Sequence, residues 1–126
     1  MITMTYASIL GLIYVALGMR VVRGRIRSRV GLGHGGNEVL ERDIRIHGNF
    51  AEYVPLALIL IALLESGGGP GILIRWLGGT LVIARLLHIW GLTQSTGGSV
   101  GRSVGTVLTF LVILTASALG LYKALT

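Results

Sequence analysis

The stretch RIHGNFAEYVPLALILIALL, residues 45–64, places Arg45, Asn49 and Glu52 at the start of a long apolar run. From His47 to Leu64 this run approaches the roughly 20 residues that a helix needs to cross about 30 Å of hydrocarbon. Glu52 lies inside it, and an ionisable side chain at the centre of a membrane helix costs roughly 2.5 to 3.5 kcal/mol on insertion scales. Such a side chain usually faces a bundle interior or binds a ligand, so Glu52 is the first candidate functional residue.

Three more apolar segments have a similar length and are predicted to span a membrane: Ile2 to Val22, Ile72 to Leu92 and Val100 to Leu125. The composition agrees, because 52% of the 126 residues are hydrophobic and only 13% are charged, against about 25% charged in an average soluble domain. The predicted fold is therefore an all-α, integral membrane four-helix bundle, with residues 1–126 forming a single four-span domain. The first segment has no basic residue before it, so we expect it to be a retained helix and not a cleaved signal peptide.

Glycine-rich turns at residues 31–36, 66–71 and 96–99 separate the four predicted spans. The first connection, residues 23–44, is predicted to be the only one large enough to form part of a site. Within it, Asn37 is expected to cap an N-terminal extension of the second helix. Pro55 is predicted to kink that helix and widen a cavity beside its polar residues, and Gly101 and Gly105 would let the fourth helix approach a neighbour closely.

The net charge of +6 is concentrated in one part of the chain. Seven of the eleven basic residues lie at or between the first two spans: Arg20, Arg23, Arg25, Arg27, Arg29, Arg42 and Arg45. The positive-inside rule then puts the first and third loops in the cytoplasm and both termini outside it. This distribution argues against nucleic acid as a partner. Two interpretations stay open: a basic collar beside anionic lipid headgroups, and a binding site for an anionic substrate.

Arg45, Asn49 and Glu52 fall at i, i+4 and i+7, so they share one stripe of the second helix. On the third helix, Arg85 and His88 are three residues apart and also share a face. Arg85 is the natural charge partner for Glu52. An alternative interpretation is purely structural: Glu52 and Arg85 form a buried ion pair that fixes helix packing, and Asn49 hydrogen-bonds across the bundle.

His47 lies about 200° around the helix axis from Arg45, so it faces a neighbouring helix or a neighbouring subunit instead. The three histidines have no recognised metal-binding spacing, and the chain has no cysteine for a thiolate site or a cysteine nucleophile. We therefore predict no metal site.

The block Arg-x-His-x-Asn-x-x-Glu-Tyr-x-Pro, from Arg45 to Pro55, resembles the signature of the MAPEG superfamily, the membrane-associated proteins of eicosanoid and glutathione metabolism. The resemblance extends to the four spans, to the basic segment after the first span and to Ala84-Arg85-Leu86 in the third. It is strongest to the short bacterial members. It therefore implies location in a bacterial inner membrane.

The resemblance implies a homotrimer whose glutathione sites lie between neighbouring subunits at the cytoplasmic side. It implies that Arg102 is the catalytic residue, an arginine that stabilises the glutathione thiolate. The remaining implied glutathione-binding residues are Arg25, Arg29, Arg45, His47, Asn49, Glu52, Tyr53, Arg85 and His88. This chain departs from the eicosanoid and glutathione enzymes late in the third helix, where His88 and Leu92 stand in place of two tyrosines that those enzymes often carry.

The implied function is a glutathione transferase that joins the thiolate to a lipophilic electrophile, with peroxidase activity on lipid hydroperoxides as an additional implied reaction. Glutathione is the implied co-substrate, and membrane lipids and a lipophilic small molecule are the other expected partners. The family also includes a member that binds a lipid without catalysis. A non-catalytic lipid-binding or scaffold protein of the same fold therefore remains the alternative.

Overall fold

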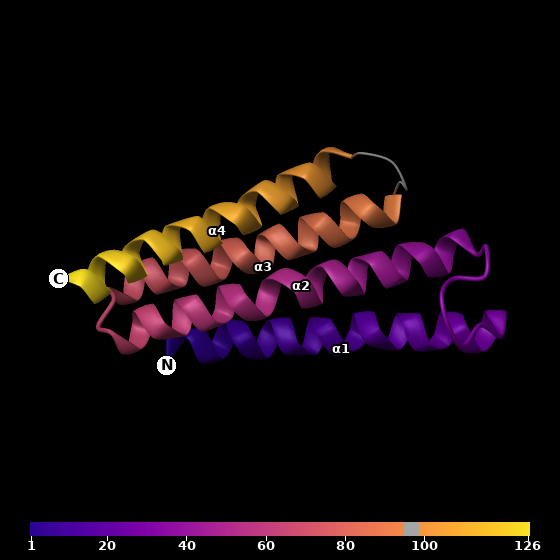
Figure 1. Ribbon diagram of the computed structural model, residues 1–126, viewed down its shortest axis with the longest axis horizontal. Coiled ribbons are helices and arrows are strands. Elements are labelled where there is room, and N and C mark those ends of the chain that lie inside the picture. The colour runs from indigo at the N-terminus through magenta and orange to yellow at the C-terminus, as the bar shows by residue number, and fades with distance from the viewer. Residues whose placement is uncertain (95–98) are drawn as a thin grey trace.

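The computed structural model describes residues 1–94 and 99–126, and within them the chain forms four long helices (Figure 1). These are α1 (Ile2–Ser28), α2 (Glu38–Ser66), α3 (Gly71–Gln94) and α4 (Val100–Leu125). The helices run alternately up and down, so both termini and the α2–α3 turn lie at one end of the bundle. Each helix is long and apolar enough to cross a membrane. The prediction of four membrane-length helices is confirmed.

The first connection is much shorter than predicted, because α1 and α2 continue past their apolar segments. It comprises only residues 29–37 and not 23–44, and both helices project beyond the ends of α3 and α4 (Figure 1). Arginine is a good helix former, and its long side chain can reach water from a helix that leaves the hydrocarbon. Asn37 caps α2 as predicted, since its Oδ1 accepts a hydrogen bond from the backbone N–H of Leu40 at 3.0 Å. Of the turn predicted over residues 96–99, residues 96–98 lie outside the described residues.

The start of α1 is held by a carboxylate at the end of α2. Glu65 accepts hydrogen bonds from the backbone N–H of Ile2 at 2.5 Å and of Thr3 at 2.8 Å. The first N–H groups of a helix have no partner within the helix, and the helix dipole favours a negative charge there. The sequence analysis did not anticipate this contact, which ties the N-terminal end of the bundle together.

Glycines bring α3 and α4 into close contact. A Cβ atom at Gly105 would lie 2.5 Å from the carbonyl oxygen of Ala84, and one at Gly91 would collide with the backbone N of Arg102. Gly101 and Gly105 are both buried against α3, as the small-residue spacing predicted. Without side chains at the contact, the two helix backbones can pack directly against each other.

Large apolar side chains cover the outer faces of the bundle. Trp76 and Trp90, near opposite ends of α3, are 70% and 59% exposed, and Leu12 of α1 is 75% exposed. In a soluble monomer such contiguous apolar exposure would be unusual. Around four membrane-length helices it is the surface expected to face lipid.

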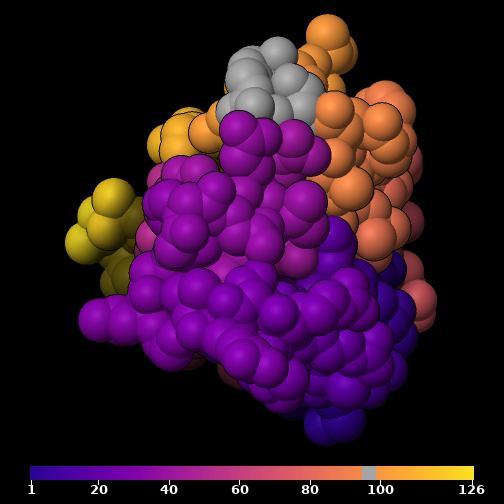
Figure 2. Space-filling model, turned by 90° about the vertical axis from the view of Figure 1, so that its right-hand side faces the viewer, coloured from indigo at the N-terminus to yellow at the C-terminus, as the bar shows by residue number. Residues whose placement is uncertain are grey.

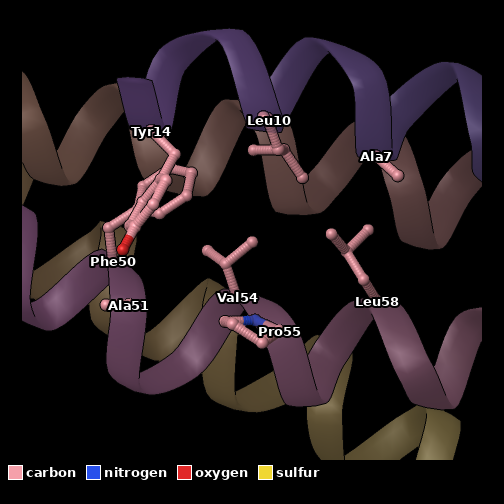
Figure 3. A pocket seen from close by; sticks show the side chains of 9 residues that line it. Ala7, Leu10, Tyr14, Phe50, Ala51, Val54, Pro55 and Leu58 are labelled. Atoms are coloured by element: carbon pink, nitrogen blue, oxygen red, sulfur yellow. The ribbon is translucent and has the colours of Figure 1, made fainter. Parts of the chain in front are cut away.

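Helix α2 continues through Pro55 without interruption, and a cavity of about 260 Å³ lies beside that residue, between α1 and α2. Leu10 of α1 and Val54 and Leu58 of α2 point into this space (Figure 3). A cavity next to Pro55 was predicted, but its walls are apolar. None of the stripe residues Arg45, Asn49 and Glu52 lines it.

Candidate functional site

Two of the predicted site residues, Arg45 and Arg102, line the same pocket. It has a volume of about 270 Å³ and lies where the start of α2, the end of α3 and the start of α4 meet. Figure 2 views this end of the molecule, with the α1–α2 connection and the first turns of α2 in purple and the α3–α4 end in orange. The residues that line this pocket are Glu41, Arg42, Arg45, Leu92 and Arg102.

The local sequence explains why these side chains converge. Because α2 begins at Glu38, Glu41 and Arg42 lie one helical turn before Arg45 and on the same side of the helix. At α4, the side chain of Ser99 accepts a hydrogen bond from the backbone N–H of Arg102 at 3.1 Å. This cap places Arg102 in the first turn of α4, where the helix dipole adds further positive potential.

The pocket has an excess of positive charge. Three guanidinium groups and one carboxylate line it, and a carboxylate is the partner that arginine binds best. The charge of the lining therefore favours an anionic group.

Glu41 and Arg42 were not predicted as members of the site. Their spacing from Arg45, four and three residues, is the helical signal that could have found them. The predicted N-terminal extension of the second helix after Asn37 already contained both residues, but the side that they share with Arg45 was not considered.

A separate polar network lies deeper in the bundle, around Arg85. This side chain is completely buried, and its Nη2 donates to Oδ1 of Asn49 at 2.8 Å and lies 3.3 Å from Nδ1 of His88. Its guanidinium carbon is 5.5 Å from the ring centre of Phe50, within cation–π range. The predicted shared face of Arg85 and His88 and the hydrogen bond of Asn49 across the bundle are confirmed. The Nε and Nη1 atoms of Arg85 have no partner among residues 1–94 and 99–126.

The predicted pairing of Glu52 with Arg85 is wrong within one chain. Glu52 is exposed on the outer face of α2, whereas Arg85 turns into the bundle toward Asn49. The ion pairs among the described residues are elsewhere: Arg20 with Asp43 at 2.8 Å, and His34 with Glu41 at 4.0 Å. Glu52 and Arg85 do not pair because the rotation of α2 about its axis turns Asn49, and not Glu52, toward α3.

Two aromatic contacts place His47 and Tyr53 on different sides of α2. His47 stacks on Tyr14 of α1 with ring centres 4.8 Å apart. Tyr53 meets Phe110 of α4 edge-on at 5.3 Å. His47 thus faces a neighbouring helix of its own chain, which is one of the two options that its position allowed.

Arg25 and Arg29 lie outside the pocket that Arg45 and Arg102 line. Arg25 donates to the carbonyl oxygen of Gly33 at 2.7 Å, so it holds the α1–α2 connection. Arg29 ends α1 in the left-handed conformation, with φ at 54°, and its side chain is exposed. Within a single chain, the structure therefore distributes the predicted residues over one pocket, one buried network and the surface.

Comparison with known proteins identifies the family of this chain. The model of the MAPEG family matches residues 3–122. The chain belongs to the MAPEG family. It is 36% identical over 91 residues to "Inner membrane protein YecN" of Escherichia coli strain K12, a match that covers 72% of this chain and 70% of that protein. The protein of the same name from Escherichia coli O6:H1 strain CFT073 matches with the same figures.

In this MAPEG chain, His88 and Leu92 stand where the resemblance implied tyrosines, and both residues have clear structural roles. His88 is 1% exposed and packs beside Arg85. Leu92 is 5% exposed and forms the apolar wall of the pocket that Arg45 and Arg102 line. Neither position supplies a hydroxyl group, so polar contacts in that pocket come from its arginines and from Glu41.

Proposed function

We propose that this protein is a glutathione-dependent membrane transferase that acts on lipophilic electrophiles. The observation that carries the proposal is the pocket in which Arg42, Arg45 and Arg102 surround an open volume with Glu41. Glutathione has two carboxylates, one amine and one thiol. Three guanidinium groups and one carboxylate match that set of charges.

In this proposal, Arg42 and Arg45 bind the carboxylates of glutathione and Glu41 accepts hydrogen bonds from its amine. Arg102, at the positive end of α4, stabilises the thiolate. A free thiol has a pKa near 8.5, and each unit by which a site lowers it corresponds to about 1.4 kcal/mol. The thiol proton passes to solvent, and the thiolate sulfur forms a bond to an electrophilic carbon. The electron pair then leaves with the displaced group or is protonated after addition. In the peroxidase reaction the same thiolate would attack the terminal oxygen of a lipid hydroperoxide, so that the O–O bond breaks and the lipid alkoxide leaves and is protonated. A second glutathione then condenses with the resulting sulfenic acid to give glutathione disulfide and water.

We further propose that the working unit is a homotrimer with its glutathione sites between subunits. Glu52 supports this proposal, because a carboxylate that faces hydrocarbon is costly and a neighbouring subunit would cover it. The exposed Arg29 and the loop-bound Arg25 could reach only a neighbour's site, since they do not line the pocket in their own chain. In such an assembly His47, Asn49, Tyr53, Arg85 and His88 act by positioning α2 and α3 around the ligand.

Thermal unfolding of the detergent-solubilised protein tests the proposal. Millimolar glutathione should raise the melting temperature, and Arg45→Ala, Arg102→Ala or Glu52→Ala should remove most of the shift. Arg75→Ala is the matched control, because Arg75 is exposed at the opposite end of α3. The ultraviolet absorbance of bound thiolate should fall in Arg102→Ala even at saturating glutathione. No shift for the unmutated protein at millimolar glutathione would refute the proposal.

A non-catalytic lipid-binding or scaffold protein is the second candidate. It is favoured by the hydrogen bond between Arg85 and Asn49, since the signature residue Asn49 there holds the bundle together. A mainly apolar groove of about 570 Å³ between the last turns of α2 and α4 is also wide enough for a lipid chain. This candidate predicts copurified lipid and no response to glutathione in the same melting experiment.

A further inference from the structure

A second basic pocket lies on the opposite side of α2 from the pocket that Arg45 and Arg102 line. It has a volume of about 400 Å³ and lies between the end of α1 and the start of α2. Residues 39, 40 and 43 of α2 face it, whereas residues 41, 42 and 45 face the other pocket. At 100° per residue these two sets point about 160° apart. The two pockets are therefore separate sites.

Arginines on one face of α1 give this pocket its charge. Arg20, Arg23 and Arg27 follow one another at about one-turn intervals and all line it. Arg20 is paired with the buried carboxylate of Asp43 at 2.8 Å. Neither Arg23 nor Arg27 has a hydrogen bond or ion pair with any part of the chain that the structure describes. Three arginines against one aspartate leave two positive charges without a partner.

An exposed apolar stripe on α1 lies about 90° around the helix axis from these arginines, on the N-terminal side of Arg23. Leu12, Val15, Met19 and Val22 are each about half exposed or more and recur at helical spacing on one face. This stripe extends over about 15 Å, from ten residues at 1.5 Å each. That is about half of the roughly 30 Å hydrocarbon thickness, or one lipid leaflet. Arg23 follows Val22 directly in the sequence. The C-terminal end of α1 projects beyond α3 and α4 (Figure 1).

We propose that this groove binds the phosphodiester headgroup of an anionic phospholipid, with an acyl chain lying along the apolar stripe of α1. Guanidinium groups bind phosphate oxygens in forked pairs, and basic pockets between membrane helices bind such headgroups. Two unpartnered arginines match the two phosphates of cardiolipin. A soluble phosphate offers the same head chemistry, but it would make no use of the apolar stripe beside the pocket.

The test measures the melting temperature of the full chain in neutral detergent with added lipid. Cardiolipin and phosphatidylglycerol should raise it more than zwitterionic phosphatidylcholine does. In the double variant Arg23→Gln/Arg27→Gln, the cardiolipin concentration for half of the effect should rise about twenty-five-fold, since each arginine near an anionic surface contributes about a factor of five. The charge-matched control is Arg25→Gln/Arg29→Asn, in which asparagine tolerates the left-handed backbone of residue 29. It should keep the lipid response.

Three results would overturn the proposal. An equal loss in the control variant would show a diffuse basic collar without a built site. A full shift with inorganic phosphate or glycerol phosphate alone would assign the site to a soluble anion. Equal responses to cardiolipin and phosphatidylcholine would show no headgroup recognition. Any response to glutathione should be the same in the Arg23→Gln/Arg27→Gln variant and in the unmutated protein, which separates this test from that of the transferase proposal.

Discussion

At the scale of single residues, Arg85 is a buried charge with few hydrogen-bond partners among the described residues. Its guanidinium is completely buried, two of its nitrogens have no partner among the described residues, and Asn49 accepts the hydrogen bond of the third at 2.8 Å. The ring of Phe50 lies on one side of it, 5.5 Å away. Asn49 is therefore the principal hydrogen-bonding partner that makes burial of this charge tolerable.

Removing that partner should destabilise the bundle. Asn49→Ala leaves Nη2 of a buried cation with only the 3.3 Å contact to Nδ1 of His88, at a cost of about 1 to 3 kcal/mol. We expect this to exceed the roughly 0.6 kcal/mol average of interhelical hydrogen bonds in membrane proteins, because Arg85 is charged and already poorly satisfied. Titration of the purified protein from mild detergent into sodium dodecyl sulfate would measure the loss. Thr115→Ala, on the exposed face of α4, is the control and should change the unfolding free energy by less than about 0.5 kcal/mol. An equally small effect of Asn49→Ala would contradict this account of Arg85.

At the scale of helices, the α3–α4 contact depends on Gly105, whereas Gly120 of the same helix has no such contact. A Cβ atom at Gly105 would lie 2.5 Å from a carbonyl oxygen and 2.8 Å from a backbone nitrogen of α3. A Cβ atom at Gly120, on the same helix, would meet no atom within 4 Å. Since Arg102 stands one turn before Gly105, this contact also sets the position of the proposed thiolate-binding arginine.

These two glycines provide a matched pair of alanine substitutions. Gly105→Ala should cost about 1 to 3 kcal/mol, because backbone atoms must move apart. Gly120→Ala should be neutral or stabilising by up to about 1 kcal/mol, since alanine is the better helix former. Melting temperatures of both variants in the same detergent check the prediction. Comparable destabilisation by the two substitutions would show that close packing at Gly105 is not what stabilises the α3–α4 pair.

At the scale of the whole molecule, positive charge is concentrated at one end. The α1–α2 connection and the arginines around it occupy the end opposite both termini (Figure 1). Both basic pockets lie at this end. Basic segments near membrane helices are retained in the cytoplasm, so we expect both pockets to open there.

The absence of cysteine from the sequence allows a direct test of this orientation. A thiol reagent that cannot cross membranes should label Ser66→Cys, near the α2–α3 turn, in intact spheroplasts. It should label His34→Cys, in the α1–α2 connection, only after the membrane is permeabilised. The two positions are exposed in the structure, so burial would not hide either thiol. The reverse pattern of labelling would invert the predicted topology.

Much of the fold could be predicted from the sequence because the relevant signals are local. The length of each apolar run determined four membrane helices, Asn37 marked the start of α2, and the spacing of Gly101 and Gly105 indicated a close helix contact. The signature from Arg45 to Pro55 was sufficient to suggest the family, which the match over residues 3–122 then confirmed.

The tertiary structure alone decided which of these residues meet. It joined Arg85 to Asn49 instead of Glu52, brought Glu41 and Arg42 into the pocket of Arg45 and Arg102, and placed Glu65 on the start of α1. Periodicity shows which residues share a face of one helix. The partner of that face depends on the rotation and register of the neighbouring helices, which many weak packing contacts determine together.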